Sequence, residues 1–401
     1  MMKHNLYQYT LVSLFIPGVL SGSALAATTW MEARNDAMGG TGVASSHYGA
    51  AALANPALMT RFAQSDDVSL ILPSVGLQAS DPDRLQDGVD GVKDAWDRYD
   101  DELSSGSVSP GTAADLKRQL EKFKNAHANV QAGAGIVATV PNSVVPFALL
   151  VKSWGTASVD GRVSDQDMAY LDGVADGSII PADDALTSRA YGRAAVVTDV
   201  GIALAREFET NGVRWSAGVT PKYQRIDLFN YNVTVQDYDR DDFRSSDYRN
   251  RVSGFNADAG AAVDLTARWR LGLAVQNIVP RSTETRSING LKETFKIRPQ
   301  ATIGTSWHSD RITVALDVDL TPASGFTSDK KHQFAGIGAE FNAWNHAQLR
   351  AGYRQNIASS EGSAFSAGIG LSPFDVVHLD LTGLVGADRT YGAVVQMSVT
   401  F

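Results

Sequence analysis

The chain has 401 residues, no cysteine and a formal net charge of -9. The absence of cysteine excludes a disulfide framework, a thiol nucleophile and a cysteine-ligated metal or iron–sulfur site. The negative charge argues against a nucleic-acid partner, because basic surfaces recognise phosphate backbones. No apolar run reaches about 18 residues, so no membrane-spanning helix is expected. A transmembrane β-barrel remains compatible with 36 glycines and 44% hydrophobic residues.

Residues 1–26 have the organisation of an export signal. Lys3 and His4 precede an apolar stretch, and Ala24-Leu25-Ala26 has the small-x-small pattern of a signal-peptidase site. The alternative is a short buried helix. We expect an exported mature chain that begins near Ala27.

Residues 27–66 are rich in glycine and alanine. Gly39, Gly40 and Gly42 permit positive φ angles and close backbone packing, as a chain folded inside a lumen requires. The sequence Asn55-Pro56 is a turn signal. A periplasmic tail or a soluble loop is the alternative for this segment, and only evidence for a barrel favours an internal location.

Residues 80–129 contain two stretches of helical periodicity. Leu85, Val89, Val92 and Trp96 are spaced three or four residues apart, as apolar residues on one face of a helix are. A second stretch that ends at Phe123 has the same spacing of apolar residues. We expect two amphipathic helices that form a cap over the external mouth of a barrel. This cap would be either a lid that captures ligand weakly or a surface hairpin that only shields the barrel.

Apolar and polar residues alternate in most of the chain after Val68, as in strands with one apolar and one wet face. Asp317, Asp319, Arg350 and Arg354 fall on the polar parity, where a barrel would face them toward its lumen. A soluble sandwich also solvates one face, so alternation leaves both folds open. We place about fourteen strands near residues 68–79, 130–140, 146–160, 188–206, 213–236, 251–265, 268–279, 295–308, 311–320, 333–342, 347–356, 363–373, 376–385 and 389–401.

Loop lengths favour the barrel. Long connections such as 80–129 and 161–187 alternate with short ones such as 141–145, and only the last hairpin departs from this order. Outer-membrane barrels have short periplasmic turns and long external loops, and bacterial single-chain examples have an even number of strands. A soluble sandwich has no reason to alternate its loops in this way.

The last strand ends the chain on an aromatic residue. Tyr391, Val395 and Val399 lie on one apolar parity that finishes with Phe401. This arrangement resembles the closing strand of bacterial outer-membrane barrels. The resemblance implies that Phe401 belongs to the signal read by the barrel-insertion machinery. The last strand of a soluble sandwich is the alternative.

The sequence ARNDAMGGTGVA, an alanine-rich stretch and Asn-Pro-Ala together resemble the N-terminal plug signature of the FadL-type outer-membrane transporter superfamily. Within it, the chain is similar to barrel proteins of the conjugal-transfer TraF type. The resemblance implies a fourteen-stranded barrel with an N-terminal hatch inside. It also implies that the hatch and ligand path include Gly39, Gly40, Gly42, Asn55, Pro56 and Ala57.

Catalytic and metal motifs are weak. The sequence MGGTGVA lacks the full G-x-G-x-x-G spacing of a dinucleotide site. Asp237, Asp239 and Asp241 have the spacing of a calcium loop, but Asp242 and Tyr248 stand where glycine and glutamate are needed. We expect no metal and no cofactor. An enzyme assembled from distant strands stays an alternative, although neither His308 nor His378 has a recognisable serine partner in the sequence.

The sequence therefore predicts an all-β, outer-membrane barrel with an N-terminal hatch, in contact with outer-membrane lipid and lipopolysaccharide. The leading function is passive passage of small hydrophobic molecules. A structural component of a conjugation envelope complex, with no transported ligand, is the first alternative. An outer-membrane enzyme is the second.

Overall fold

The computed structural model describes residues 31–183, 185–234, 246–344, 346–360, 362–373, 376–387 and 389–401. The export signal expected at 1–26 and the aspartates at 237, 239 and 241 lie outside these residues. Among the helices of the described ranges, none combines the length and hydrophobicity needed to cross a membrane.

Fourteen of the described strands pair antiparallel in one closed barrel, which confirms the predicted fold class. The ring closes where β1 (Ser69–Ser80) pairs with β17 (Thr390–Thr400). Closure gives each strand a partner on both sides, so no sheet edge is left unpaired. The other barrel strands are β2 (His127–Val140), β3 (Phe147–Arg162), β4 (Arg189–Thr210), β5 (Val213–Thr234), β6 (Arg249–Asp264), β7 (Trp269–Gln276), β10 (Gln300–His308), β11 (Ile312–Asp319), β13 (Phe334–Trp344), β14 (Ala347–Asn356), β15 (Ala364–Leu371), β16 (Val377–Gly386).

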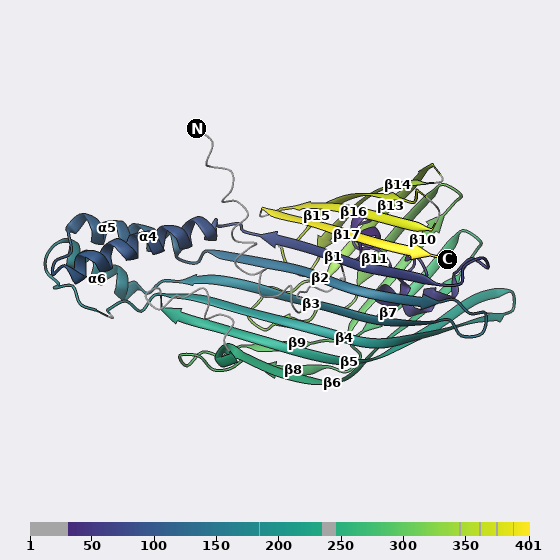
Figure 1. The fold of residues 1–401 in the computed structure, drawn as a ribbon, viewed down its shortest axis with the longest axis horizontal. Helices are drawn as coiled ribbons and strands as arrows, with labels where there is room; N and C mark the ends of the chain where they lie inside the picture. Colours follow the sequence, from purple (N-terminus) through teal and green to yellow (C-terminus); the bar gives the residue numbers. More distant parts are fainter. Residues whose placement is uncertain are drawn as a thin grey trace.

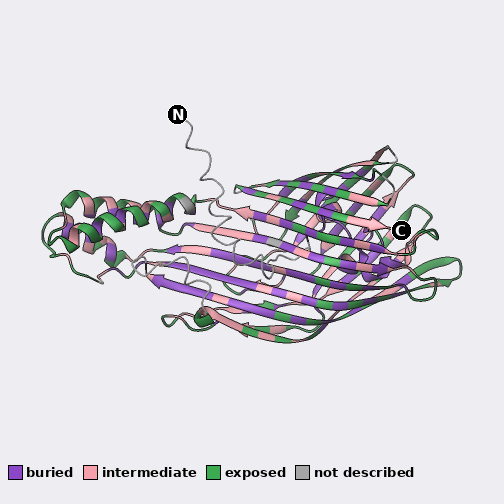
Figure 2. Cartoon of the chain, in the orientation of Figure 1, coloured by how far each residue is buried: buried purple, intermediate pink, exposed green. Residues whose placement is uncertain are grey.

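Burial follows the alternation of the sequence. In β11, the side chains of Val314 and Leu316 are 38% and 43% exposed, whereas Ala315 and Asp317 are 1% and 5% exposed. Figure 2 shows the same alternation of buried and exposed residues along most barrel strands. The outer face is therefore apolar and the inner face polar, as a barrel in lipid requires.

The stretch predicted as one strand over 295–308 forms two strands in different sheets. β9 (Thr294–Ile297) lies outside the barrel ring, and only β10 is part of it. Pro299 stands between them and has no N–H to donate, so the ladder breaks there.

Two connections expected to be loops also contain short strands. β8 (Arg281–Glu284) and β12 (Gly325–Phe326) flank β9 in a three-stranded sheet of order β12-β9-β8. We call this unit the mouth sheet. Its two contributing connections, 277–299 and 320–333, both leave the barrel at the same end, because the turns at the other ends of β7, β10 and β11 are short.

Three helices extend the molecule beyond that end (Figure 1). These are α4 (Leu85–Ser104), α5 (Pro110–Phe123) and α6 (Asp165–Ala175), which we call the helical arm. We name this end of the barrel the arm end, and the opposite end, with its short connections, the turn end. The arm continues past the tips of β2, β3 and β4 instead of lying across the opening as a cap.

The arm has its own core. Ser109 caps α5 by accepting a hydrogen bond from the Thr112 N–H, and Pro110 starts the helix. Leu116 and Leu120 of α5 pack with Tyr99 of α4 and Leu171 of α6. This contiguous apolar cluster fixes the three helices against one another and against the strand tips.

Candidate functional site

The N-terminal segment, residues 31–60, lies inside the barrel. It contains α2 (Ala33–Ala37), α3 (Ala51–Ala54) and the 3-10 helix η2 (Pro56–Thr60). Its residues reach nearly opposite walls, because Gly39 packs against Gly352 of β14 while Pro56 packs against Gly218 of β5. The segment therefore spans the lumen from wall to wall.

Glycine is required where the segment meets the wall. Gly39 and Gly40 have φ angles of 72° and 81°, in the region that side chains rarely adopt. A Cβ on Gly39 would lie 2.6 Å from the Tyr353 carbonyl oxygen and 2.7 Å from that of Ile337. The positive φ and the close approach both follow from the glycine-rich motif.

Asp317 is the wall residue that holds this motif. Its Oδ2 accepts hydrogen bonds from the N–H groups of Gly42 at 2.7 Å and Val43 at 2.8 Å. A carboxylate that accepts two backbone N–H groups makes charge-assisted bonds, which are stronger than neutral ones.

Asn55 holds the second half of the segment. Its Nδ2 donates to the carbonyl oxygens of Val43 at 2.7 Å and Ala261 at 3.1 Å, and its Oδ1 accepts from the Ala57 N–H. Asn55 thus caps η2 and joins it to both the segment and the wall. Pro56 begins η2, and the side chains of Asn55 and Ala57 are fully buried.

The other three polar residues expected in the lumen are buried on the wall, each with different partners. Asp319 accepts from the Thr302 hydroxyl at 2.6 Å and from the Phe334 N–H at 2.9 Å. Arg354 donates to Gln78 and lies 3.7 Å from Asp36 of the segment. Because burial disfavours the charged form, it raises the pKa of the Asp36 carboxyl to about 7, and Arg354 opposes that rise.

Arg350 belongs to an ion-pair chain that ends on the segment. Its guanidinium pairs with Asp380 and, at 2.7 Å, with Glu340. Glu340 in turn accepts two hydrogen bonds of 2.9 Å from Arg34. Arg34 also donates to the Ser45 carbonyl oxygen. This chain holds α2 to β13, β14 and β16.

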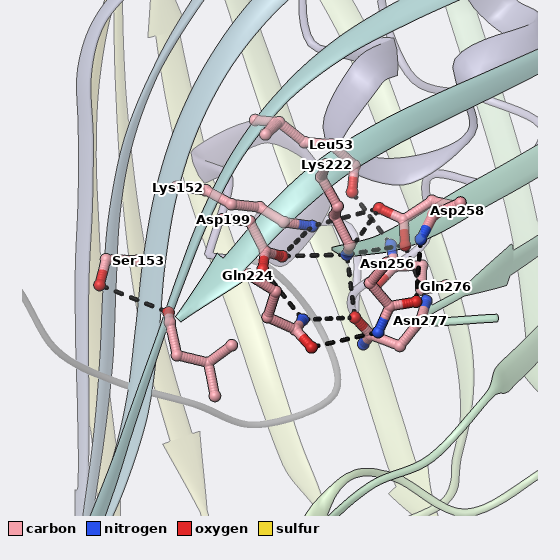
Figure 3. A network of polar contacts seen from close by, with 12 residues as sticks. Leu53, Lys152, Ser153, Asp199, Lys222, Gln224, Asn256, Asp258, Gln276 and Asn277 are labelled. Carbon is pink, nitrogen blue, oxygen red and sulfur yellow. Dashed lines mark hydrogen bonds and ion pairs between the residues drawn. The ribbon is translucent and has the colours of Figure 1, made fainter. Parts of the chain in front are cut away.

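A second buried polar group lines the inner face of the neighbouring strands β3 to β6, beside η2 (Figure 3). Lys222 Nζ lies 2.9 Å from Asp199 and 2.8 Å from Asp258, and Lys152 lies within 4 Å of the same two carboxylates. The side chain of Lys222 is completely buried. Two lysines and two aspartates balance in charge, and we call this group the polar layer.

The polar layer separates two apolar regions of the lumen. On its turn-end side, Leu53, Leu58 and Met59 of the segment pack with Leu150 and other wall residues. On its arm-end side, Phe295 and Phe326 of the mouth sheet pack with Val197 and other wall residues. The lumen is therefore filled from both ends.

Three cavities lie within the lumen or at its mouth. One of about 400 Å³ opens at the arm end, away from the segment, and is bordered by Gln78, Asp160 and Arg193. One of about 300 Å³ at the turn end is bordered by Arg34 of the segment and by Arg350. A small one of about 60 Å³ lies against Asp36, Asp317 and Arg354 — polar side chains therefore border each of these spaces.

Phe401 lies at the seam of the ring. Its N–H donates to the Val68 carbonyl oxygen at 2.9 Å, while its ring is 60% exposed. The backbone of the last residue therefore takes part in closing the barrel, and its side chain faces outward.

A serine does lie near one of the two histidines that the sequence left unpartnered. Ser372 Oγ and His378 Nδ1 are 2.7 Å apart across one hairpin. Within the described residues no hydrogen bond joins His378 to a carboxylate, so the pair lacks the third member of a hydrolase triad. The described residues also contain no group of three acidic or histidine side chains placed to hold a metal ion.

Sequence reasoning missed several residues that hold the segment or fill the lumen. Glu340 and Asp199 are single charges in otherwise uncharged strand stretches, and Arg34 lies between Glu32 and Asp36 outside any strand. Parity marks Glu340 and Asp199 as lumen-facing, but strand alternation alone gives no pairing between distant elements. The signal that could have found them is the balance of opposite charges on the polar parity.

Solved structures with the same fold include hydrocarbon channels. The toluene transporter TbuX of Ralstonia pickettii matches with a TM-score of 0.55 and 14% identity, over 93% of this chain and 98% of that chain. The toluene transporter TodX of Pseudomonas putida matches with 0.53 and 12%, over 94% and 98%. The CymD monoaromatic hydrocarbon channel matches with 0.51 and 13%, over 92% and 96%. At these identities the likeness confirms the FadL-type barrel fold and nothing finer.

A family model described as "F plasmid transfer operon, TraF, protein" matches residues 52–319. That range runs from α3 to the end of β11 and covers more than half of the chain. No curated protein matches the sequence.

Proposed function

We propose, from the premise that this chain belongs to the family of F plasmid transfer operon TraF proteins, that it is a bacterial outer-membrane channel for small hydrophobic molecules. Passage is by diffusion and needs no cofactor. The N-terminal segment is the hatch, and the channel conducts when that segment leaves its seat on the wall.

The observation that carries this proposal is the attachment of the segment. Its first half is held mainly by hydrogen bonds and ion pairs, such as those of Gly42 to Asp317 and of Arg34 to Glu340. Its second half, which includes Leu53 and Leu58, also packs in an apolar cluster with the wall. Polar contacts can be exchanged for water, so the first half is the part that can leave its seat most readily.

The fold supports the class of solute and the orientation. Structures with this barrel include channels for toluene and other monoaromatic hydrocarbons. Short turns lie on the periplasmic side of outer-membrane barrels, so the turn end would face the periplasm and the helical arm the exterior. The apolar residues beside the polar layer, such as Val197 and Ile226, would form the wall that a hydrophobic solute passes.

Uptake of 1-N-phenylnaphthylamine by intact Gram-negative cells tests the proposal, because lipopolysaccharide excludes this apolar dye and its fluorescence rises when it reaches the inner membrane. We expect faster uptake in cells that express the chain than in cells that carry an empty vector. Equal rates, at verified surface expression, would contradict a channel for hydrophobic molecules.

The helical arm favours a second candidate, a structural component of a conjugation envelope complex. The arm is a self-contained three-helix unit that projects away from the lumen, as a docking platform would (Figure 1). Replacing residues 85–123 with a short glycine-serine linker distinguishes the two. Loss of plasmid transfer with unchanged dye uptake favours this candidate, and unchanged transfer contradicts it.

A further inference from the structure

The mouth sheet occupies the lumen at the arm end independently of the N-terminal segment. Phe295, Ile297 and Phe326 are at most 2% exposed and pack on Val197 and Leu228 of the inner wall. The rings of Phe295 and Phe326 meet edge to face, with centroids 5.1 Å apart. The sheet thus places large apolar side chains where the lumen would otherwise be open.

The mouth sheet is fastened to the wall by polar contacts. Asn230 Nδ2 donates to the carbonyl oxygens of Arg286 at 2.7 Å and Leu291 at 2.9 Å, and Asn232 Nδ2 donates to that of Ile288 at 3.1 Å. These amides lie on the inner face of β5 and bind the backbone of the connection that carries β8 and β9. These hydrogen bonds therefore end on backbone carbonyl groups, which water can also solvate.

One ion pair fastens the other connection. Arg193, on the inner face of β4, has its Nη2 2.8 Å from Asp329 Oδ1 and its Nε 3.1 Å from the same oxygen. Arg193 also pairs with Asp160 of β3. The Arg193 side chain is 4% exposed and that of Asp329 is 19% exposed, so the pair is shielded from water on one side only.

The N-terminal segment and the mouth sheet, which fill the lumen from opposite ends, are held independently of each other. The hydrogen bonds found for residues 31–60 end on barrel strands or within the segment, and none of those in the described chain reaches β8, β9 or β12. The polar layer of Lys152, Asp199, Lys222 and Asp258 lies between the two apolar clusters along the strands. Movement of one therefore leaves the contacts of the other in place.

We propose that the mouth sheet is a second gate, in series with the N-terminal segment, and that the Arg193–Asp329 ion pair is its latch. In the closed state Phe295 and Phe326 cover the apolar lumen wall. When the latch opens, the connection 320–333 carries Phe326 away from Phe295, so that β9 alone covers Val197 and its neighbours and the arm-end opening reaches them from one side. This gate exists whether or not the chain conducts a solute.

The lack of native cysteine permits a direct test of access. Val197→Cys places one thiol under the gate, at a fully buried position, and Ser107→Cys places one on the exposed surface of the arm as a control. Labelling of the purified full chain with a charged maleimide measures access rather than transport. A failure of hydrocarbon uptake therefore does not affect the result.

We expect the thiol at position 197 to react at least about tenfold more slowly than the thiol at 107. Adding Asp329→Asn should accelerate labelling at 197 about tenfold, and Asp329→Glu, which keeps the charge, should restore slow labelling. Asp317→Asn, which loosens the N-terminal segment, should leave labelling at 197 unchanged. The gate is overturned by equally fast labelling at 197 and 107 in the otherwise native chain, by no response to Asp329→Asn, or by the same acceleration from Asp317→Asn.

Discussion

The Asp317 carboxylate holds the Gly42 N–H at 2.7 Å, across 275 residues of sequence. The same oxygen holds the Val43 N–H, so one wall residue anchors the glycine motif of the N-terminal segment. Asp317→Asn removes the charge from both bonds. We expect a loss of about 2 kcal/mol of local stability, the usual scale for hydrogen bonds to a charged group.

Hydrogen exchange measures this loss in peptides that cover residues 39–46. Exchange there should become faster, while exchange in β10 and β11 stays slow. Asp319→Asn is the matched control, because Asp319 binds Thr302 and Phe334 rather than the segment. Equal acceleration in both variants would show that Asp317 is not the anchor.

Gly39→Ala should destabilise the folded barrel. Gly39 has a φ of 72°, and an added Cβ would meet the backbone of Tyr353 and Ile337. Gly106→Ala is the control, since Gly106 has a φ of 101° but open space around it. We expect about 1 to 3 kcal/mol from backbone strain in both variants and a further loss from the clash in Gly39→Ala. Thermal unfolding in detergent measures both, and equal midpoints would contradict the tight contact.

Lys222→Met should be strongly destabilising. Gln224 and Asn277 still donate to Asp199 and Asp258, but the nearest cation left to them is Lys152, whose nitrogen is 3.9 Å and 3.8 Å away. Removing one partner of a buried ion pair costs about 3 to 5 kcal/mol, because a charge is left uncompensated.

Urea unfolding of the refolded protein in detergent measures the free energy of unfolding of Lys222→Met for comparison with that of the native chain. Lys93→Met is the control, because Lys93 pairs with Asp97 on the exposed surface of α4 and should change stability little. Similar small effects of both changes would mean that the polar layer is hydrated rather than buried.

Phe401→Ala should reduce assembly without weakening the folded barrel. The ring of Phe401 is 60% exposed, and the barrel seam uses only its backbone. Tyr391→Ala removes a ring of similar exposure, 61%, from β17, the strand that Phe401 follows, but away from the terminus. We expect less folded chain in the membrane for Phe401→Ala only, measured by heat-modifiable migration of membrane extracts. Equal losses for both would mean that exposed aromatic area, and not the terminal position, matters.

Residue alternation and loop lengths predicted the fold well, because a barrel imposes a period of two on every strand and a different loop style on each end. The glycine motif likewise predicted the backbone conformation at Gly39 and Gly40, because a positive φ and a close backbone approach both favour glycine. Pairs such as Arg34 with Glu340 could not be predicted, because their contact depends on where an internal segment lies. The mouth sheet was missed because β8, β9 and β12 are four residues or shorter, too short to show a period.

In the proposed channel, a solute can pass only when the N-terminal segment moves. Met31→Cys with Gly133→Cys tests it, since a Cβ at position 133 would lie 3.6 Å from the Met31 Cβ, within the range of about 3.5 to 4.5 Å that suits a disulfide. We expect uptake of 1-N-phenylnaphthylamine to stop when this pair is oxidised and to return on reduction, with no redox response in either single variant. Uptake at the same rate in the oxidised and reduced double variant would contradict it.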